Sequence, residues 1–131
     1  MPKEDMPPDV LELLSRPNPA VIATLNAAGG PVTVATWYLW DSGKVLVNMD
    51  GSRVRLKHMR ADPRVSLTVL DGADWYRHVS LRGRVVTLED DPDLTDIDRL
   101  SQHYRGQPYP VRDQPRVSAW IEVDSWHSWG R

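Results

Sequence analysis

Short apolar runs and alternating apolar and polar positions recur along most of the chain, and this pattern predicts strands more than long helices. The clearest alternation lies near the C-terminus, where Val117, Ala119, Ile121 and Val123 share one side. Turn-forming residues such as Asp41-Ser42-Gly43 separate the runs. We expect six strands, over residues 20–25, 32–40, 44–49, 65–70, 76–88 and 117–123.

Two of these expected strands carry further information. In the segment 32–40 both alternating rows are largely apolar, which predicts cover on both faces, and the segment forms a hairpin with 44–49. In the segment 76–88, Gly83 interrupts a long run. A glycine at such a position is typical of a bulge or a bend at a barrel corner.

Three short amphipathic or polar segments between the strands have helix start and stop signals. We expect helices that begin at Pro7-Pro8-Asp9, at Ser52 as an N-cap and at Asp91-Pro92, and that end before Pro17, before Pro63 and at Gly106. Six strands and three short helices, joined mainly by turns, predict a mainly β fold built as a closed or half-closed antiparallel barrel. The length of 131 residues predicts a single domain over residues 1–131.

Composition narrows the kinds of chemistry that the chain can perform. It has no cysteine, which excludes disulfides, thiolate metal sites and a cysteine nucleophile, and the four histidines show no metal-ligand spacing. The polar N-terminus and the lack of long apolar runs predict a cytoplasmic protein with no membrane segment. The net charge of −2 argues against a nucleic-acid partner, so any anion site must be local.

One segment does carry a strong local charge. Residues 53–64 hold five cations against one acid, a local net charge of +4, at the start of the second expected helix. Cations at a helix N-terminus repel the helix dipole unless an anion lies nearby, and a phosphate would find free backbone N–H groups there. A solvated basic face explains the same residues equally well, so the segment alone leaves both interpretations open.

The residues around this segment resemble a known family. Val47-Asn48-Met49, the alternating cations of Arg53-Val54-Arg55-Leu56-Lys57, and Arg60-Ala61-Asp62-Pro63-Arg64-Val65 are similar to the pyridoxamine-phosphate-oxidase-like split-barrel flavoproteins. The stretch from Trp75 to Val85 resembles the branch of small flavin and deazaflavin oxidoreductases, many of which use coenzyme F420. The resemblance covers nearly all of the chain from Val21 onward. It implies a split barrel and a homodimer with two cofactor sites at the subunit interface.

The resemblance also implies which residues contact the cofactor. An edge strand would lie along the flavin or deazaflavin ring, the next strand would line its side, and cations would hold the phosphate. The partner chain would add residues from the turn before the fifth strand. The residues in these positions are Val34, Ala35, Thr36 and Trp37; Asn48, Met49 and Asp50; Arg53, Arg55 and Lys57; and, from the partner, Trp75, Tyr76 and Arg77.

The leading functional hypothesis is a reductase in which reduced F420 delivers a hydride to an unsaturated small molecule, such as an enone, a quinone or a tetrapyrrole. The cofactor then carries the chemistry, so no acid–base pair is required in the sequence and no catalytic residue is identified. The first alternative is an FMN-dependent oxidase or reductase of the same fold. The second is a non-enzymatic protein that binds a cofactor or a haem-like ligand.

Overall fold

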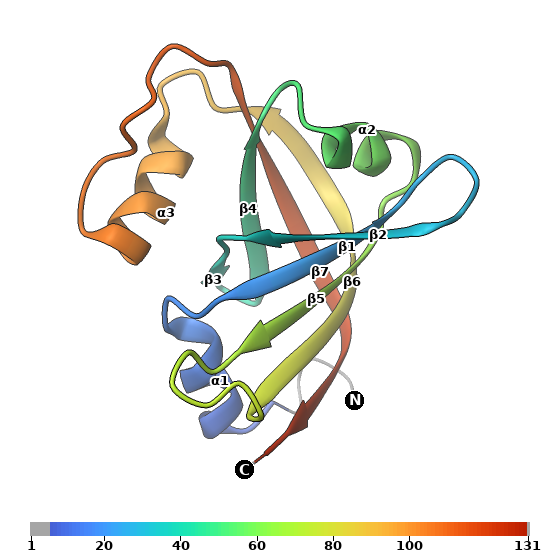
Figure 1. Ribbon diagram of the computed structural model, residues 1–131, viewed down its shortest axis with the longest axis vertical. Helices are drawn as coiled ribbons and strands as arrows, with labels where there is room; N and C mark the ends of the chain where they lie inside the picture. The colour runs from blue at the N-terminus through green and yellow to red at the C-terminus, as the bar shows by residue number, and fades with distance from the viewer. Residues whose placement is uncertain (1–5, 131) are drawn as a thin grey trace.

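The computed structural model describes residues 6–130, and within them seven strands form one antiparallel sheet (Figure 1). The order across the sheet is β2-β1-β5-β6-β7-β4-β3. The strands are β1 (Ala20–Leu25), β2 (Pro31–Thr36), β3 (Leu39–Asp41), β4 (Lys44–Asp50), β5 (Arg64–Leu70), β6 (His78–Asp90) and β7 (Arg116–Trp129). The helices are α1 (Pro8–Ser15), α2 (Val54–Ala61) and α3 (Thr95–Arg105).

The sheet curves into a split barrel because its two edge strands are neighbours along the chain. β2 and β3 lie at opposite ends of the strand order, yet only Trp37 and Tyr38 separate them. The three peptide steps from Thr36 to Leu39 span at most roughly 11 Å. The edges must therefore approach each other at this point, and the mainly β split barrel expected from the sequence is confirmed.

The single strand expected over 32–40 is wrong, and the structure has seven strands instead of six. β2 pairs with β1, whereas β3 pairs with β4, so the expected hairpin with 44–49 forms only through Leu39–Asp41. The sequence pattern does not show this break, because Tyr38 continues the alternation of apolar side chains from residue 32 to residue 40. The Tyr38 ring is fully buried and its hydroxyl donates to the backbone oxygen of Leu14 at 2.8 Å. The cover expected on both faces is also absent within this chain, since β2 is exposed from Pro31 to Ala35.

The ends of several elements differ from the expected ones for local reasons. Ser52 does not cap α2; its hydroxyl donates to the Asp50 carboxylate, and Arg53 occupies the N-cap position without a side-chain cap. α3 begins at Thr95, later than expected. The Asp91 carboxylate accepts the backbone N–H groups of Asp96 and Ile97 there.

The long strands β6 and β7 form the back of the barrel. β7 continues to Trp129, beyond the expected end at residue 123, because its last residues pair with the start of β6. β6 begins at His78, not at residue 76. The bulge expected at Gly83 is confirmed: the register shifts between Arg82 and Gly83, and a side chain at Gly83 would collide with the backbone oxygen of Glu122.

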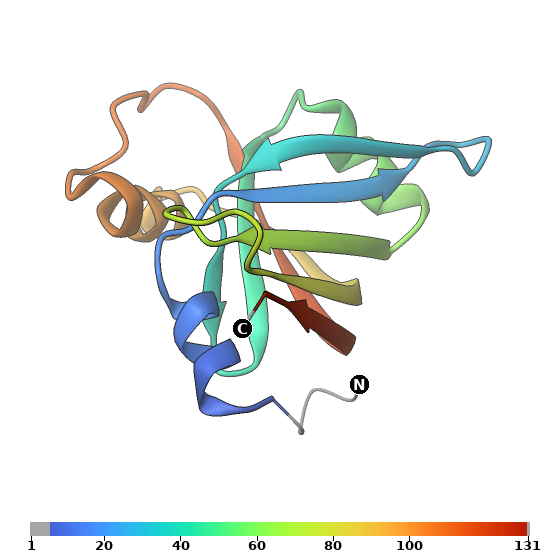
Figure 2. The same cartoon turned by 60° about the horizontal axis from the view of Figure 1, so that its bottom comes forward.

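The core fills the inside of the barrel, and α1 closes one end of it. Inward side chains of five strands are fully or almost fully buried, and α1 adds Val10, Leu13 and Leu14 from below. In both views α1 lies at one end of the curved sheet, beside the β5–β6 turn, and α2 lies toward the other end (Figures 1 and 2). α3 stands outside the barrel, where Ile97 and Leu100 pack against Leu46.

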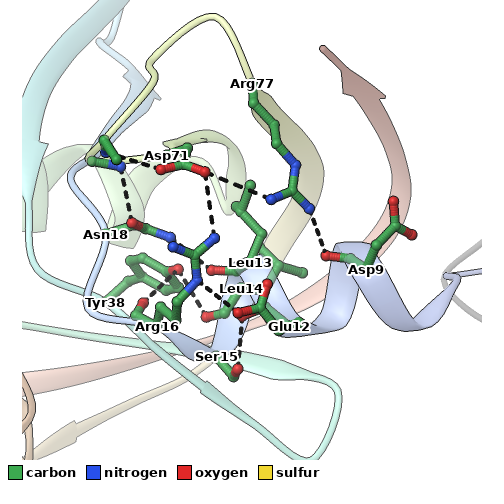
Figure 3. A network of polar contacts seen from close by, with 12 residues as sticks. Asp9, Glu12, Leu13, Leu14, Ser15, Arg16, Asn18, Tyr38, Asp71 and Arg77 are labelled. Carbon is green, nitrogen blue, oxygen red and sulfur yellow. Dashed lines mark hydrogen bonds and ion pairs between the residues drawn. The ribbon is translucent and has the colours of Figure 1, made fainter. Parts of the chain in front are cut away.

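A polar network ties α1 and its following loop to the β5–β6 turn (Figure 3). The Asp71 carboxylate pairs with Arg16 at 3.4 Å and with Arg77 at 3.6 Å, and Arg77 also donates to the backbone oxygen of Asp9. Asn18 accepts the N–H of Gly72 and donates to the backbone of α1. This network fixes the loop between α1 and β1, to which the Tyr38 hydroxyl also donates through Arg16 O.

Replacing Tyr38 by phenylalanine tests this anchor. The variant removes the hydroxyl that satisfies Leu14 O and Arg16 O, so we expect a loss of about 1–2 kcal/mol in the free energy of unfolding, measured with urea. Tyr76→Phe is the control, because Tyr76 is 57% exposed, and we expect almost no change there. Equal stability of Tyr38→Phe and the parent protein would contradict the anchoring role.

Candidate functional site

A cavity of about 630 Å³ opens where the two edge strands approach each other. This volume is within the range of roughly 300–1,000 Å³ that small-molecule sites occupy. Six parts of the chain line the cavity: the loop before β1 with the first residue of that strand, the end of β2 with Trp37, β4 at Asn48, the start of α2, the inner face of α3 with the loop behind it, and the start of β7. The lining residues are Pro17, Pro19, Ala20, Val34, Ala35, Thr36, Trp37, Asn48, Arg53, Arg55, Ile97, Leu100, Tyr104, Tyr109 and Arg116.

One end of the cavity is strongly cationic. Arg53 and Arg55 come from the start of α2, and Arg116 comes from β7, directly opposite Asp50 in the strand register. The Arg55 Nε atom is buried and has no hydrogen-bond partner among residues 6–130. Burial, and then the charges of Arg53 and Arg116, lower the pKa of Arg55. A partly buried guanidinium whose Nε has no partner is unfavourable unless an anion binds to it.

The nearest carboxylate neutralises only part of this charge. Asp50 pairs with Arg53 at 3.0 Å, and the hydrogen bond from Ser52, more than the nearby arginines, lowers the pKa of Asp50. Three guanidinium groups against one carboxylate leave about two positive charges. A phosphate at neutral pH carries approximately the opposite charge and offers several acceptor oxygens. The residues at this end therefore fit the phosphate group of a flavin-type cofactor.

The other end of the cavity is aromatic and apolar. The rings of Trp37 and Tyr104 stack with centroids 5.3 Å apart and planes 10° apart, and Tyr109 meets Trp37 edge-on at 6.2 Å. The Tyr104 hydroxyl donates to the backbone oxygen of Asn18 at 2.7 Å and accepts the N–H of Tyr38. Burial raises the pKa of Tyr104 to about 12. Tyr104 is therefore a fixed wall of the cavity and not a source of protons.

The edge of β2 offers a third kind of contact. β2 pairs only with β1, so its outer edge has unpaired backbone N–H and C=O groups within the part of the chain that the structure describes. Val34, Ala35 and Thr36 on this strand line the cavity between its two ends. A planar heterocycle lying along them could hydrogen-bond to the backbone.

The structure brings together seven of the residues that the resemblance implied. Val34, Ala35, Thr36, Trp37, Asn48, Arg53 and Arg55 all line the cavity. Asp50 lies behind Arg53, Met49 is fully buried in the core, and the exposed Lys57 is not part of the lining.

The residues expected from the partner chain lie elsewhere in this chain. Trp75 and Tyr76 are 72% and 57% exposed in the β5–β6 turn, and Arg77 packs against α1 (Figure 3). None of the three lines the cavity of its own chain.

Sequence reasoning missed the three polar or aromatic lining residues Tyr104, Tyr109 and Arg116, and also the apolar lining residues Pro17, Pro19, Ala20, Ile97 and Leu100. Tyr104 sits at the end of an amphipathic helix, where the pattern shows only a helix terminus. Tyr109 lies in a proline-rich loop that has no periodicity. Arg116 joins the cluster only through pairing of β4 with β7, which brings residues 50 and 116 together.

The described residues were also compared with the requirements of a metal site and of a membrane-spanning helix. Within residues 6–130, no group of three or more His, Asp or Glu side chains could hold a metal ion. The same part of the chain contains no helix long and apolar enough to span a membrane.

Comparison with known proteins identifies relatives over almost the full length. A family profile described as pyridoxamine 5'-phosphate oxidase matches residues 6–130. A solved structure of an F420 reductase is 26% identical, with a TM-score of 0.84, over 93% of this chain and 98% of the other. No curated protein matches the chain.

Two further solved structures are similar in fold. A conserved hypothetical protein, Rv2991 from Mycobacterium tuberculosis, is 21% identical with a TM-score of 0.74, over 95% of this chain and 84% of the other. General Stress Protein 26 from Bacillus anthracis is 14% identical with a TM-score of 0.71, over 97% of this chain and 92% of the other. At these identities the likeness concerns the fold.

Replacing Arg55 by methionine tests whether the cationic cluster is maintained for a ligand. Removing a partly buried charge that Arg53 and Arg116 repel should raise the unfolding free energy of the ligand-free protein by about 1 kcal/mol. Arg60→Met is the control on the exposed side of α2, where a change within roughly 0.5 kcal/mol is expected. A clear loss of stability in Arg55→Met would mean that this side chain serves the fold.

Proposed function

The chain belongs to the pyridoxamine 5'-phosphate oxidase family, and from this premise we propose that it is a reductase dependent on the deazaflavin coenzyme F420. Reduced F420 would pass a hydride to an unsaturated small molecule of the enone, quinone or tetrapyrrole kind. The family supports the coarser statement, a flavin-binding oxidoreductase. The observation that carries the proposal is the cavity itself, which joins three converging arginines to an aromatic end.

The choice of F420 rests on two observations. The F420 reductase is similar over nearly all of both chains. F420 also carries an anionic lactyl-glutamate tail beyond its phosphate, and α2 presents the exposed cations Lys57 and Arg60 outside the cavity. FMN is the second candidate, because the family profile is that of a flavin-using oxidase and FMN shares the phosphate and the planar ring.

In this proposal the bound cofactor supplies the hydride, and the protein binds and orients it. Arg53 and Arg55 hold the phosphate, and Asp50 keeps Arg53 in position through their ion pair. The edge of β2 supports the ring along Val34–Thr36. Tyr104 keeps its proton in the hydrogen bond to Asn18 and is not the proton donor in this proposal.

We further propose that the protein is a homodimer with the sites at the interface. Five of the nine exposed large apolar side chains of residues 6–130 lie on β2 or in one aromatic group at the other end of the barrel, and contiguous exposed apolar surface is typical of protein interfaces. Val32 and Val34 of β2 are 42% and 39% exposed, and Tyr76 contacts Trp75 and Trp129 edge-on in an exposed aromatic group. Trp75, Tyr76 and Arg77 of one chain would then complete the cavity of the other.

Charge reversal at the cationic end tests the phosphate assignment. We expect Arg53→Glu/Arg55→Glu to lower the affinity for F420 at least 100-fold, because two charge-assisted contacts worth about 1.5–3 kcal/mol each become repulsive. Binding is followed by the fluorescence of the cofactor. Lys44→Glu is the matched control, because Lys44 is an exposed cation at the start of β4 and outside the lining. Lys57→Glu and Arg60→Glu measure whether the exposed cations of α2 contribute through the anionic tail. Unchanged affinity in the double variant would exclude this end as the phosphate site.

Mixed dimers test whether the partner completes the site. The Trp75→Ala/Tyr76→Ala variant should bind F420 weakly because each chain fails to complete the cavity of its partner. The Arg55→Glu variant should bind F420 weakly because each chain lacks the phosphate contact in its own cavity. Co-expressed with two different tags, the two variants should form heterodimers that regain one intact site in every two. Heterodimers that bind no better than either parent variant, or a monomer by light scattering, would contradict the interface site.

A further inference from the structure

Asn48 lines the cavity, but its side chain is fully engaged inside the protein. Its Nδ2 donates to the Asp91 carboxylate at 3.1 Å and to the Ser118 hydroxyl at 3.0 Å. Its Oδ1 accepts from the Nε of Arg116 at 2.7 Å. Both amide hydrogens are therefore used, and the residue is only 6% exposed.

The partners of Asn48 are themselves held in place. The same Asp91 carboxylate accepts two backbone N–H groups at the start of α3, and Ser118 donates to Asp96 in that helix at 2.7 Å. Asn48 is thus fixed between β7 and the N-terminus of α3. Its remaining function toward the cavity is to set the direction of the Arg116 guanidinium.

Arg116 extends from the cationic end of the cavity, near Arg55, toward the aromatic end. Its guanidinium carbon is 4.7 Å from the ring centroid of Tyr109, which in turn meets Trp37 edge-on. Its charge is also close enough to affect Arg55 at the cationic end. Nε is taken by Asn48, and Arg116 makes no other side-chain hydrogen bond or ion pair within residues 6–130. The terminal nitrogens remain free to donate, as a planar pair, to two neighbouring acceptors.

We propose that Arg116 binds the ring of the cofactor and not its phosphate, with Asn48 as the positioning residue that aims it; this rests on the proposed function. Arg53 and Arg55 already supply the phosphate site at α2. The pyrimidine edge of a flavin or deazaflavin offers neighbouring carbonyl and nitrogen acceptors, and a positive charge at that edge favours the electron-rich reduced form. The paired N–H groups of Arg116 match such an edge.

Two pairs of probes separate ring contacts from phosphate contacts. F420 is compared with its phosphate-free riboside, and FMN with riboflavin, by fluorescence titration of the full-length protein. We consider the pair, F420 type or FMN type, that the parent protein binds more tightly. Arg116→Met should lower the affinity for both molecules of that pair by about 10-fold or more, because the lost contact is to the ring that they share. Arg55→Met should weaken only the phosphate-bearing member. Arg116→Lys, which keeps the charge and loses the planar fork, should weaken both by a smaller factor.

A double-mutant cycle tests the role of Asn48. Asn48→Leu should weaken the phosphate-free probe as Arg116→Met does, and combining the two should cause no further loss, because Asn48 acts through Arg116. Asn48→Ser, which is too short to reach Arg116, serves the same purpose if the leucine variant does not fold. Thr24 is buried, forms a hydrogen bond with His58 and lies outside the cavity lining and the Asn48 network. Thr24→Val should therefore lower the unfolding temperature without changing the affinity for the phosphate-free probe.

The outcomes separate this inference from the function on which it rests. If Arg116→Met weakens only the phosphate-bearing probe, Arg116 is a third phosphate ligand and the inference is wrong. If the losses from Asn48→Leu and Arg116→Met add, Asn48 acts independently and its positioning role is wrong. If the parent protein binds none of the four probes, the proposed function fails, and the inference fails with it.

Discussion

The link of Trp37 and Tyr38 is the constraint on which the rest of the structure depends. It joins the two strands at opposite edges of the sheet, and so it forces the sheet to close on itself. Tyr38 turns inward and is held by the backbone after α1, whereas Trp37 turns toward α3 and stacks on Tyr104. One residue thus fixes the barrel and its neighbour forms the wall of the cavity. The position of the site follows directly from the closure of the fold.

The cavity combines groups that do not stabilise one another. Arg53, Arg55 and Arg116 repel, and Asp50 offsets part of their charge. Beside them, Asn48, Asp91 and Ser118 form a network of satisfied hydrogen bonds. The contrast between this network and the Arg55 Nε, which has no partner among residues 6–130, is typical of a site prepared for an anion.

Local patterns predicted the barrel class, α1, the bulge at Gly83 and the cations of α2, because each depends on residues close together in the sequence. The break at Trp37-Tyr38 could not be predicted, since alternation continues through it and only the contacts of Tyr38 with Leu14 and Arg16 reveal the change of edge. Arg116 was missed for a similar reason. Its place beside Arg55 depends on the pairing of β7 with β4, which no local pattern encodes.

The central claim is that this cavity binds a phosphate-bearing deazaflavin. It is tested most directly by equilibrium titration of the unmodified protein with F420 and, separately, with FMN, following cofactor fluorescence at moderate salt. The account predicts saturable binding of F420, with FMN bound more weakly because it lacks the anionic tail that α2 would contact. Preference for FMN would contradict the choice of cofactor, and binding of neither would contradict the assignment of the cavity itself.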